Sequence, residues 1–310
     1  MNNGSRPEIS GQRILVTGGA GFIGSHIAET LVTDNDVVVL DDLSSGTREY
    51  VPDTAEVIEG DIRDRETVSE AMAGVDIVFH QAAIVSVERS VADPEETHDV
   101  NLRATLQLLE VARRESAKVI FASSAAIYGQ PNDVPIGESD PKQPTSPYGL
   151  SKLTADQYIR LYADLYDLEA ISLRYFNVYG PRQTGGDYSG VISIFLQQAQ
   201  NGEPLTVHGD GEQTRDFVHV RDVVQANLLA AKYGTKGDVY NVGTGESVSI
   251  RELAEIVRSV AGSRKSNRIK HIDARDGDID RSQADITSIV SELGFEPNIQ
   301  LKDGLKELGR

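Results

Sequence analysis

The segment that decides the fold is RILVT at Arg13–Thr17, followed directly by GGAGFIG at Gly18–Gly24. A short apolar run comes first, then glycines spaced G-x-x-G-x-x-G, and then a helical pattern that continues to about Thr30. A glycine turn lets the backbone approach a pyrophosphate, and the N-terminus of the following helix presents free N–H groups to the anion. A tight strand-to-helix turn without a ligand would use the same glycines, so the surrounding pattern has to decide between the two.

The surrounding pattern alternates short apolar runs with amphipathic segments up to about residue 176. Strands that are apolar on both faces and separated by helices predict a parallel sheet covered on both sides. The fold class is therefore α/β, a doubly wound parallel sheet of the Rossmann type, and residues 1–176 are predicted to be its dinucleotide-binding domain. The predicted strands are 13–17, 37–40, 55–58, 76–79, 118–123 and 169–176, and further helices are expected over 65–72, 94–115 and 148–166.

The pattern becomes irregular beyond Asn177, where loops rich in Gly, Pro and Asp separate shorter helices. We predict that residues 177–310 form a second, smaller mixed α/β domain that completes a cleft and binds the substrate. Its helices are expected near 191–201, 220–233, 249–261, 284–292 and 301–308.

Composition excludes several classes of function. The 310 residues include 30 Lys plus Arg against 48 Asp plus Glu, a formal net charge of −18, and no cysteine. Such a charge repels nucleic-acid backbones and anionic headgroups, and no apolar stretch is long enough to span a membrane, so we expect neither partner and a cytoplasmic location. Disulfides, thiolate catalysis and cysteine metal sites are excluded, and no metal is predicted. A high-salt cytoplasm would favour this composition, and ordinary acidic drift would produce it equally well.

Carboxylates end the second and third predicted strands. Asp41, followed by Asp42, can accept hydrogen bonds from the adenosine ribose hydroxyls and would repel a 2′-phosphate. No Arg lies at 41–46, so NAD is favoured over NADP. Asp61 and Ile62 are placed to meet the adenine ring, although a helix N-cap explains Asp61 equally well.

The candidate catalytic residues are Tyr148 and Lys152, whose i, i+4 spacing puts both side chains on one helix face. A Tyr with a pKa of about 10 is a weak base, but a nearby ammonium and the positive nicotinamide ring favour the phenolate. Ser124 ends a predicted strand at the sheet edge that binds ligands, and Asn101 lies on the preceding helix. Each feature alone is explained by a surface pair or a turn residue; together they indicate proton transfer.

On these residues the sequence resembles the extended short-chain dehydrogenase/reductase family of NAD-dependent epimerases and dehydratases, and within it the UDP-glucose (UDP-galactose) 4-epimerases. The resemblance runs from about Arg13 to Leu308. Among the stretches that carry it are VTGGAGFIGSH (16–26), PYGLSK (147–152), LRYFNVYGPRQ (173–183) and GDGEQTRDFVHVRD (209–222).

The resemblance implies that Tyr148 is the base and that Lys152 and Ser124 are its partners. It implies NAD contacts for Gly18, Gly21, Phe22, Ile23, Gly24, Asp41, Asp42, Ser44, Ser45, Gly46, Asp61, Ile62, Gln81, Ala82, Ala83, Asn101, Ser123, Tyr148, Lys152 and Phe176. It implies contacts with a UDP-sugar for Ser124, Tyr148, Asn177, Val191, Thr206, Val207, His208, Arg215, Arg275 and Asp278. The two Arg side chains offer forked donors to a pyrophosphate, whereas a surface ion pair is the alternative for each alone.

The implied reaction is 4-epimerisation of a UDP-hexose through a transient 4-keto sugar. Ala125 and Ala126 stand where related dehydratases carry a Thr-Asp-Glu set and decarboxylases a Glu, so dehydration is not expected. Ser282 falls near the sugar's 2-substituent and leaves room for an N-acetyl group. The alternatives are a UDP-uronate epimerase or another nucleotide-sugar oxidoreductase of this family, and a non-catalytic NAD-binding module, which would not need Ser124, Tyr148 and Lys152 together.

The helices expected over 94–115 and 148–166 carry more Leu, Tyr and Ala than one core face requires. In the family these two helices pair across a two-fold axis, so the resemblance implies a homodimer joined by a four-helix bundle. Burial against the chain's own sheet is the alternative.

Overall fold

The computed structural model describes the chain except for residues 1–6, 184–189, 261–267, 276 and 310. Its centre is a seven-stranded sheet in which all paired neighbours are parallel, which confirms the predicted doubly wound α/β class. The strand order reverses between β1 and β4, and such a switch point is where these sheets bind ligands. In spatial order the strands are β11 (Val239–Val242), β6 (Ala170–Tyr175), β5 (Lys118–Ser124), β4 (Ile77–His80), β1 (Arg13–Thr17), β2 (Asp36–Asp41) and β3 (Glu56–Glu59).

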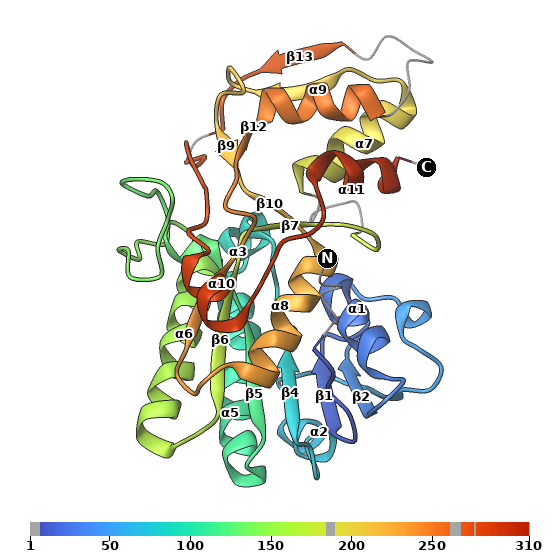
Figure 1. Ribbon diagram of the computed structural model, residues 1–310, viewed down its shortest axis with the longest axis vertical. Coiled ribbons are helices and arrows are strands. Elements are labelled where there is room, and N and C mark those ends of the chain that lie inside the picture. Colours follow the sequence, from blue (N-terminus) through green and yellow to red (C-terminus); the bar gives the residue numbers. More distant parts are fainter. Residues whose placement is uncertain (1–6, 184–189, 261–267, 276, 310) are drawn as a thin grey trace.

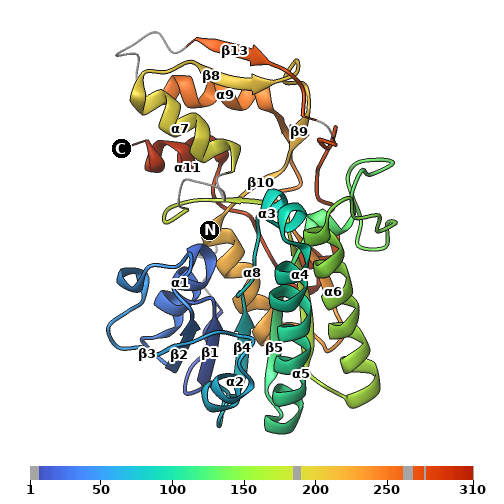
Figure 2. The ribbon, with the colours of Figure 1, turned by 180° about the vertical axis from the view of Figure 1, so that it is seen from behind.

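The inner strands are buried on both faces because their apolar residues alternate between two cores. In β1, Ile14 and Val16 belong to one core and Leu15 to the other, and all three side chains are fully buried. Helices of both layers cover the sheet (Figures 1 and 2). One layer contains α2 (Arg65–Ala71), α4 (Pro94–His98), α5 (Ala104–Glu115) and α6 (Pro147–Tyr166), and the other contains α1 (Phe22–Leu31), α8 (Val220–Tyr233) and α10 (Thr287–Leu293).

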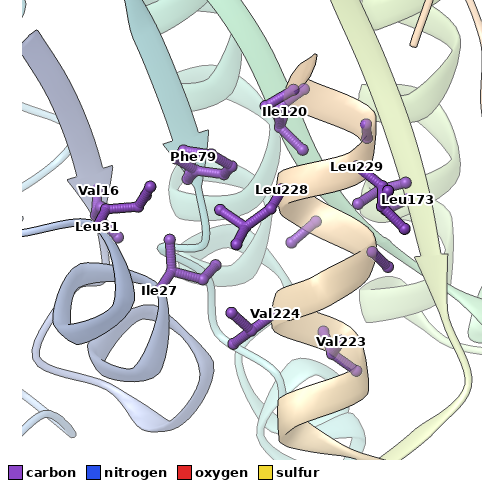
Figure 3. Close-up of a cluster of buried hydrophobic side chains, with 14 of the residues drawn as sticks. Val16, Ile27, Leu31, Phe79, Ile120, Leu173, Val223, Val224, Leu228 and Leu229 are labelled. Atoms are coloured by element: carbon purple, nitrogen blue, oxygen red, sulfur yellow. The ribbon is translucent and has the colours of Figure 1, made fainter. Parts of the chain in front are cut away.

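Figure 3 shows buried side chains where helices α1 and α8 of the second layer pack against the sheet. Ile27 of α1 and Leu228 of α8 pack together against Val16 and Phe79 of the sheet. Helix α8 packs beside α1 and covers this face of the sheet. It comes from beyond residue 176, whereas most strands of the sheet come from before that residue.

Residues from both sides of the predicted boundary at 176/177 pack into the large layered body. Both α8 and the edge strand β11 come from beyond the boundary, and both belong to the large layered body. The division of the chain into two domains at this point remains a prediction. Sequence reasoning missed β11 because Asn241 interrupts its four residues, VYNV, so no continuous apolar run marks the strand.

The remaining C-terminal residues form a smaller body, drawn at the top of Figure 1, with an apolar core of its own. Parallel β8–β13 and antiparallel β9–β12 pairs lie there, and β7 pairs with β10. Its elements are β7 (Asn177–Tyr179), α7 (Val191–Asn201), β8 (Leu205–His208), β9 (Thr214–Arg215), β10 (Phe217–His219), β12 (Val248–Ser249), α9 (Ile250–Val260), β13 (Ile269–Ile272) and α11 (Leu301–Leu308).

The helix predicted over 94–115 is interrupted. Asp93 caps its start by accepting a hydrogen bond from Glu96 N at 2.9 Å, and a π-helical turn, η2 (Asp99–Arg103), lies between α4 and α5. This wide turn directs Asn101 inward, where its side chain pairs with the backbone of Ile84. Three short helices went unpredicted: η1 (Arg48–Tyr50), α3 (Val87–Ala92) and η3 (Ala125–Ile127).

Candidate active site

A cavity of about 490 Å³ lies along the carboxyl ends of the parallel strands. Residues that end or follow β1, β2, β4, β5 and β6 line it, so it lies at the predicted edge of the sheet. Its predicted cofactor residues are Gly18, Gly21, Phe22, Ile23, Gly24, Asp41, Asp42, Ser44, Ser45, Ile62, Gln81, Ala82, Ala83, Ser123, Tyr148, Lys152 and Phe176.

The glycine turn forms one wall of the cavity. Gly18 has φ +65°, and a Cβ atom there would lie 2.7 Å from the backbone nitrogen of Ala82, so only glycine fits. Gly21 is the N-cap of α1 and contributes no side-chain hydrogen bond. The N–H groups of the first helical turn therefore remain available to a phosphate.

Asp41 is bound to this turn by its own carboxylate. One oxygen accepts from Ala20 N and the other from Leu43 N, both at 2.9 Å. Burial raises the pKa of Asp41, and these two N–H groups act in the opposite direction. Asp42 accepts from the backbone and hydroxyl of Ser44 at 2.9 and 2.6 Å. The carboxylate that the sequence assigned to a ribose is thus fixed relative to the phosphate turn.

Three predicted cofactor residues lie outside the lining of the cavity: Gly46, Asp61 and Asn101. Gly46 packs against Ala20, whose backbone carbon would lie 2.9 Å from a Cβ at this position. Asp61 receives a forked pair of hydrogen bonds from Arg63, which lowers the pKa of the carboxyl. The alternative explanation for Asp61 is wrong, because Asp64 is the residue that caps α2.

Ser124, Tyr148 and Lys152 all line the cavity. Ser146 caps α6 by accepting from Gly149 N at 3.1 Å, so Tyr148 lies in the first turn of the helix and Lys152 one turn later. The Ser124 hydroxyl hydrogen-bonds the Tyr148 phenol. Burial raises the pKa of Tyr148, and the bond from Ser124 opposes that rise.

Lys152 is only 3% exposed, and burial lowers its pKa to about 7. Its ammonium donates to the carbonyl of Ala122 at 2.8 Å and lies 4.9 Å from the centre of the Phe121 ring. Lys152 lies one helical turn from Tyr148 on the same face of α6, and a positive charge there favours the phenolate when the site binds its ligands.

A buried chain of hydrogen bonds supports the loop at 81–84 from behind. Thr105 donates to Asn101 O at 2.8 Å and lies 2.9 Å from His80 Nε2, while Thr17 Oγ1 lies 2.7 Å from His80 Nδ1. Because Thr105 already donates its hydroxyl proton to Asn101 O, it can only accept from His80. Nε2 of His80 therefore carries the imidazole proton, and Nδ1 accepts a hydrogen bond from the Thr17 hydroxyl. Burial lowers the pKa of His80 to about 3, so it stays neutral. Thr17 also accepts from Ala82 N, at 3.2 Å, which links the chain to the cavity wall.

The predicted substrate residues are less closely gathered. Arg215 forms an ion pair with Asp278, and Arg275 Nε donates to His208 Nε2 at 3.2 Å. Gln213, which the sequence reasoning missed, donates to His208 O at 3.1 Å and to Asp278 at 3.4 Å, so the two pairs are neighbours. Burial lowers the pKa of Arg215.

Other predicted substrate residues have structural partners. Thr206 accepts from Gln198 Nε2 at 2.8 Å, and Val207 is fully buried in the core of the smaller body. Asn177 donates to Asp216 O at 3.1 Å, and Val191 begins α7. Of the ten predicted residues, Ser124 and Tyr148 line the large cavity, and Arg215 lines a smaller one of about 160 Å³.

Several lining residues were not predicted. Val178 and Gln183 belong to the stretch LRYFNVYGPRQ, so the resemblance held a signal for them. Arg89 of α3 and Glu96 of α4 form an ion pair at 2.7 Å. No local sequence pattern predicts this pair. Among the described residues, no group of three His, Asp or Glu side chains is arranged for a metal ion, and no helix is long and apolar enough to cross a membrane.

Residues 14–243 match the sequence pattern of the NAD dependent epimerase/dehydratase family. The chain belongs to this family. The resemblance to extended short-chain dehydrogenase/reductases is confirmed, and this epimerase/dehydratase family member is an NAD-dependent enzyme. The glycine turn, the fixed Asp41 carboxylate and the cavity of about 490 Å³ that they line fit that cofactor.

Relatives of this family member cover nearly its whole length. UDP-glucose 4-epimerase of Mycolicibacterium smegmatis is 39% identical over 302 residues, which are 94% of this chain and 96% of that protein. The structure of UDP-glucose 4-epimerase with UDP-glucose from Thermotoga maritima matches with a TM-score of 0.91 and 39% identity, covering 95% and 96% of the two chains. UDP-N-acetylglucosamine 4-epimerase from Methanobrevibacter ruminantium M1 in complex with UDP-N-acetylmuramic acid matches with a TM-score of 0.92 and 37% identity, covering 97% and 98%.

Proposed function

We propose that this enzyme interconverts a UDP-hexose and its 4-epimer, with UDP-glucose and UDP-galactose as substrates and the N-acetyl forms accepted as well. The observation that carries the proposal is that Ser124, Tyr148 and Lys152 line the same cavity as the glycine turn and Asp41. The relatives solved with UDP-sugars support the choice of substrate. A role in galactose metabolism in the cytoplasm follows from this proposal.

Bound NAD supplies the reversible oxidation of the sugar carbon. Tyr148 takes the proton of the 4-hydroxyl as that carbon is oxidised, and Ser124 shares the proton through its hydrogen bond to the phenol. Lys152 stabilises the phenolate. The 4-keto sugar turns over about its phosphate linkage, and Tyr148 returns the proton when the opposite face is reduced, so no cofactor is consumed.

The positive side chains of the smaller body hold the nucleotide in this proposal. Arg215 and Arg275 bind the pyrophosphate. Because Arg215 forms an ion pair with Asp278, the phosphate has to compete with the Asp278 carboxylate for this guanidinium. Their neighbour Gln213 adds an amide donor beside His208. Ser282 is buried, donates its backbone N–H to Thr214 O at 3.1 Å and lines neither cavity, so its place near the sugar's 2-substituent rests on the resemblance.

The turn after Ser124 disfavours dehydration. Ala125 and Ala126 begin η3 there, so this turn offers no carboxyl group to protonate a leaving hydroxyl. A UDP-uronate epimerase or another oxidoreductase of the family is the alternative, and only the substrate separates these from a hexose epimerase.

The test is incubation with UDP-hexoses, UDP-N-acetylhexosamines and UDP-uronates, with products identified by NMR and nicotinamide absorbance followed at 340 nm. We expect the 4-epimer of a UDP-hexose to accumulate while the absorbance of reduced nicotinamide stays flat. Stoichiometric formation of NADH, or turnover of uronates alone, would refute the hexose assignment.

The homodimer also belongs to this proposal. Leu150, Leu161 and Leu165 are 56, 45 and 62% exposed, and their spacing puts them on one face of α6. A two-fold axis beside this face would bring α5 and α6 together with their copies, which buries the exposed leucines.

Leu161→Arg is expected to convert the dimer to a monomer, because the change places a charge in an apolar interface. The mass would be measured by multi-angle light scattering in native salt. Val290→Arg, a change at an apolar residue of α10 that is 41% exposed, is the control and should leave the mass unchanged. A monomeric wild-type protein would disprove the dimer.

A further inference from the structure

The segment Val178–Gln183 leaves the sheet region and passes beside α1, and its residue Arg182 has an unusual backbone. Its φ is +68°, in the left-handed region that residues with a Cβ rarely adopt. Such a conformation persists only where surrounding contacts hold it, and in enzymes it often marks a functional position.

The contacts that hold Arg182 all come from the dinucleotide-binding part of the chain. Its guanidinium donates to Ser25 Oγ at 3.2 Å and to the Glu29 carboxylate at 2.7 Å, and both partners lie on α1. The guanidinium carbon lies 5.4 Å from the centre of the Tyr50 ring. His26, also on α1, donates through Nε2 to Pro181 O at 3.0 Å.

The same segment also forms part of the wall of the large cavity. Val178 and Gln183 line it, and so does the first turn of α1, Phe22–Gly24. Gln183 closes the segment on itself by donating to Val178 O at 3.2 Å. Arg182 therefore joins a segment that lines the cavity to α1, whose first turn lines the same cavity.

We propose that Arg182 is a positioning residue that retains the cofactor, because it clamps residues 178–183 to α1 beside the phosphate-binding turn. The proposal deepens the proposed function and rests on it: an epimerase restores its cofactor in each cycle and has no need to exchange it, whereas a net dehydrogenase must release NADH. Releasing the nicotinamide dinucleotide requires the contacts to Ser25 and Glu29 to open first.

The test measures the cofactor directly. The enzyme is loaded with NADH, mixed with excess NAD, and the loss of bound-nicotinamide fluorescence gives the dissociation rate. Arg182→Gly removes the clamp and, since glycine tolerates positive φ, introduces no new backbone strain. We expect this variant to release NADH about tenfold faster, because a forked, charge-assisted contact is lost.

Two further variants should give intermediate NADH dissociation rates, and a third serves as the control. Arg182→Lys keeps a charge near Glu29 but loses the fork, so its rate should fall between those of wild type and Arg182→Gly. Glu29→Gln should also give an intermediate rate. Arg221→Ala removes an Arg that pairs with Glu307 on the surface, and it should leave the rate at the wild-type value.

The thermal midpoint of the cofactor-free protein should change little in Arg182→Gly, which separates cofactor retention from a general loss of structure. A wild-type NADH dissociation rate in Arg182→Gly would overturn the proposal even if the enzyme epimerises UDP-hexoses. If Arg182→Gly released NADH faster but the wild-type enzyme did not epimerise UDP-hexoses, the role of Arg182 in retaining the cofactor would be supported and the proposed reaction would be refuted.

Discussion

Tyr148→Phe is expected to lower epimerase turnover by a factor of about 10² to 10⁴, the usual contribution of a positioned proton-transfer group. The change deletes one oxygen, the atom that hydrogen-bonds the Ser124 hydroxyl and takes the substrate proton in the proposed mechanism. The ring stays, and so do Lys152 and its bond to Ala122. NAD should therefore remain bound, as measured by its absorbance in the purified protein.

The matched control is Tyr158→Phe. Tyr158 lies on the same helix, packs edge-on against Tyr162 with ring centres 6.5 Å apart, and does not line the cavity. Its variant should turn over at the wild-type rate. If Tyr148→Phe retained wild-type turnover, another group would have to be the base and the proposed mechanism would fail.

Asp156→Ala is expected to destabilise the protein by about 3–5 kcal/mol, because it leaves a buried guanidinium without its counter-charge. Asp156 on α6 and Arg174 on β6 are each 1% exposed and joined by two hydrogen bonds of 2.9 and 3.1 Å. Arg174 also donates to Tyr128 OH at 3.0 Å and to Glu138 O at 2.8 Å. One buried ion pair thus joins the catalytic helix, the sheet and the loop that follows Tyr128.

Urea unfolding monitored by circular dichroism would measure the loss, with equal slopes required for the comparison. Glu255→Ala breaks an exposed ion pair with Arg258 and should cost about 0.5 kcal/mol or less. A loss below about 1 kcal/mol for Asp156→Ala would mean that water or a rearranged partner satisfies Arg174, contrary to this account.

Features that depend on neighbouring residues were predictable. The glycine turn, Asp41 and the Tyr148–Lys152 spacing each lie within one strand–turn or one helical turn, so the local pattern already specifies their geometry. The continuous apolar runs in β1 and β2 likewise predicted burial on both faces. These features converge on one cavity because parallel strands bring their carboxyl ends to one edge of the sheet.

Features that depend on distant residues were not predictable. Asn101 was expected at the cofactor, but the π-helical turn directs it to the backbone of Ile84, where it supports the cavity wall from behind. Strands of two residues, such as β12, are too short to show periodicity, and β11 has no continuous apolar run because Asn241 interrupts it. Buried ion pairs such as Arg174–Asp156 cannot be recognised in a sequence, since an Arg or an Asp at either position is equally compatible with an exposed surface residue.

From the sequence alone followed the doubly wound sheet, the glycine turn after β1 and the candidate proton-transfer residues, because each depends on spacing within a few residues. Only the tertiary structure decided that α8 and β11 return to the first domain, and that Arg182 reaches Ser25 and Glu29, more than 150 residues away along the chain. Those outcomes depend on which faces remain to be covered once the layers pack, and no single stretch of the chain contains that information.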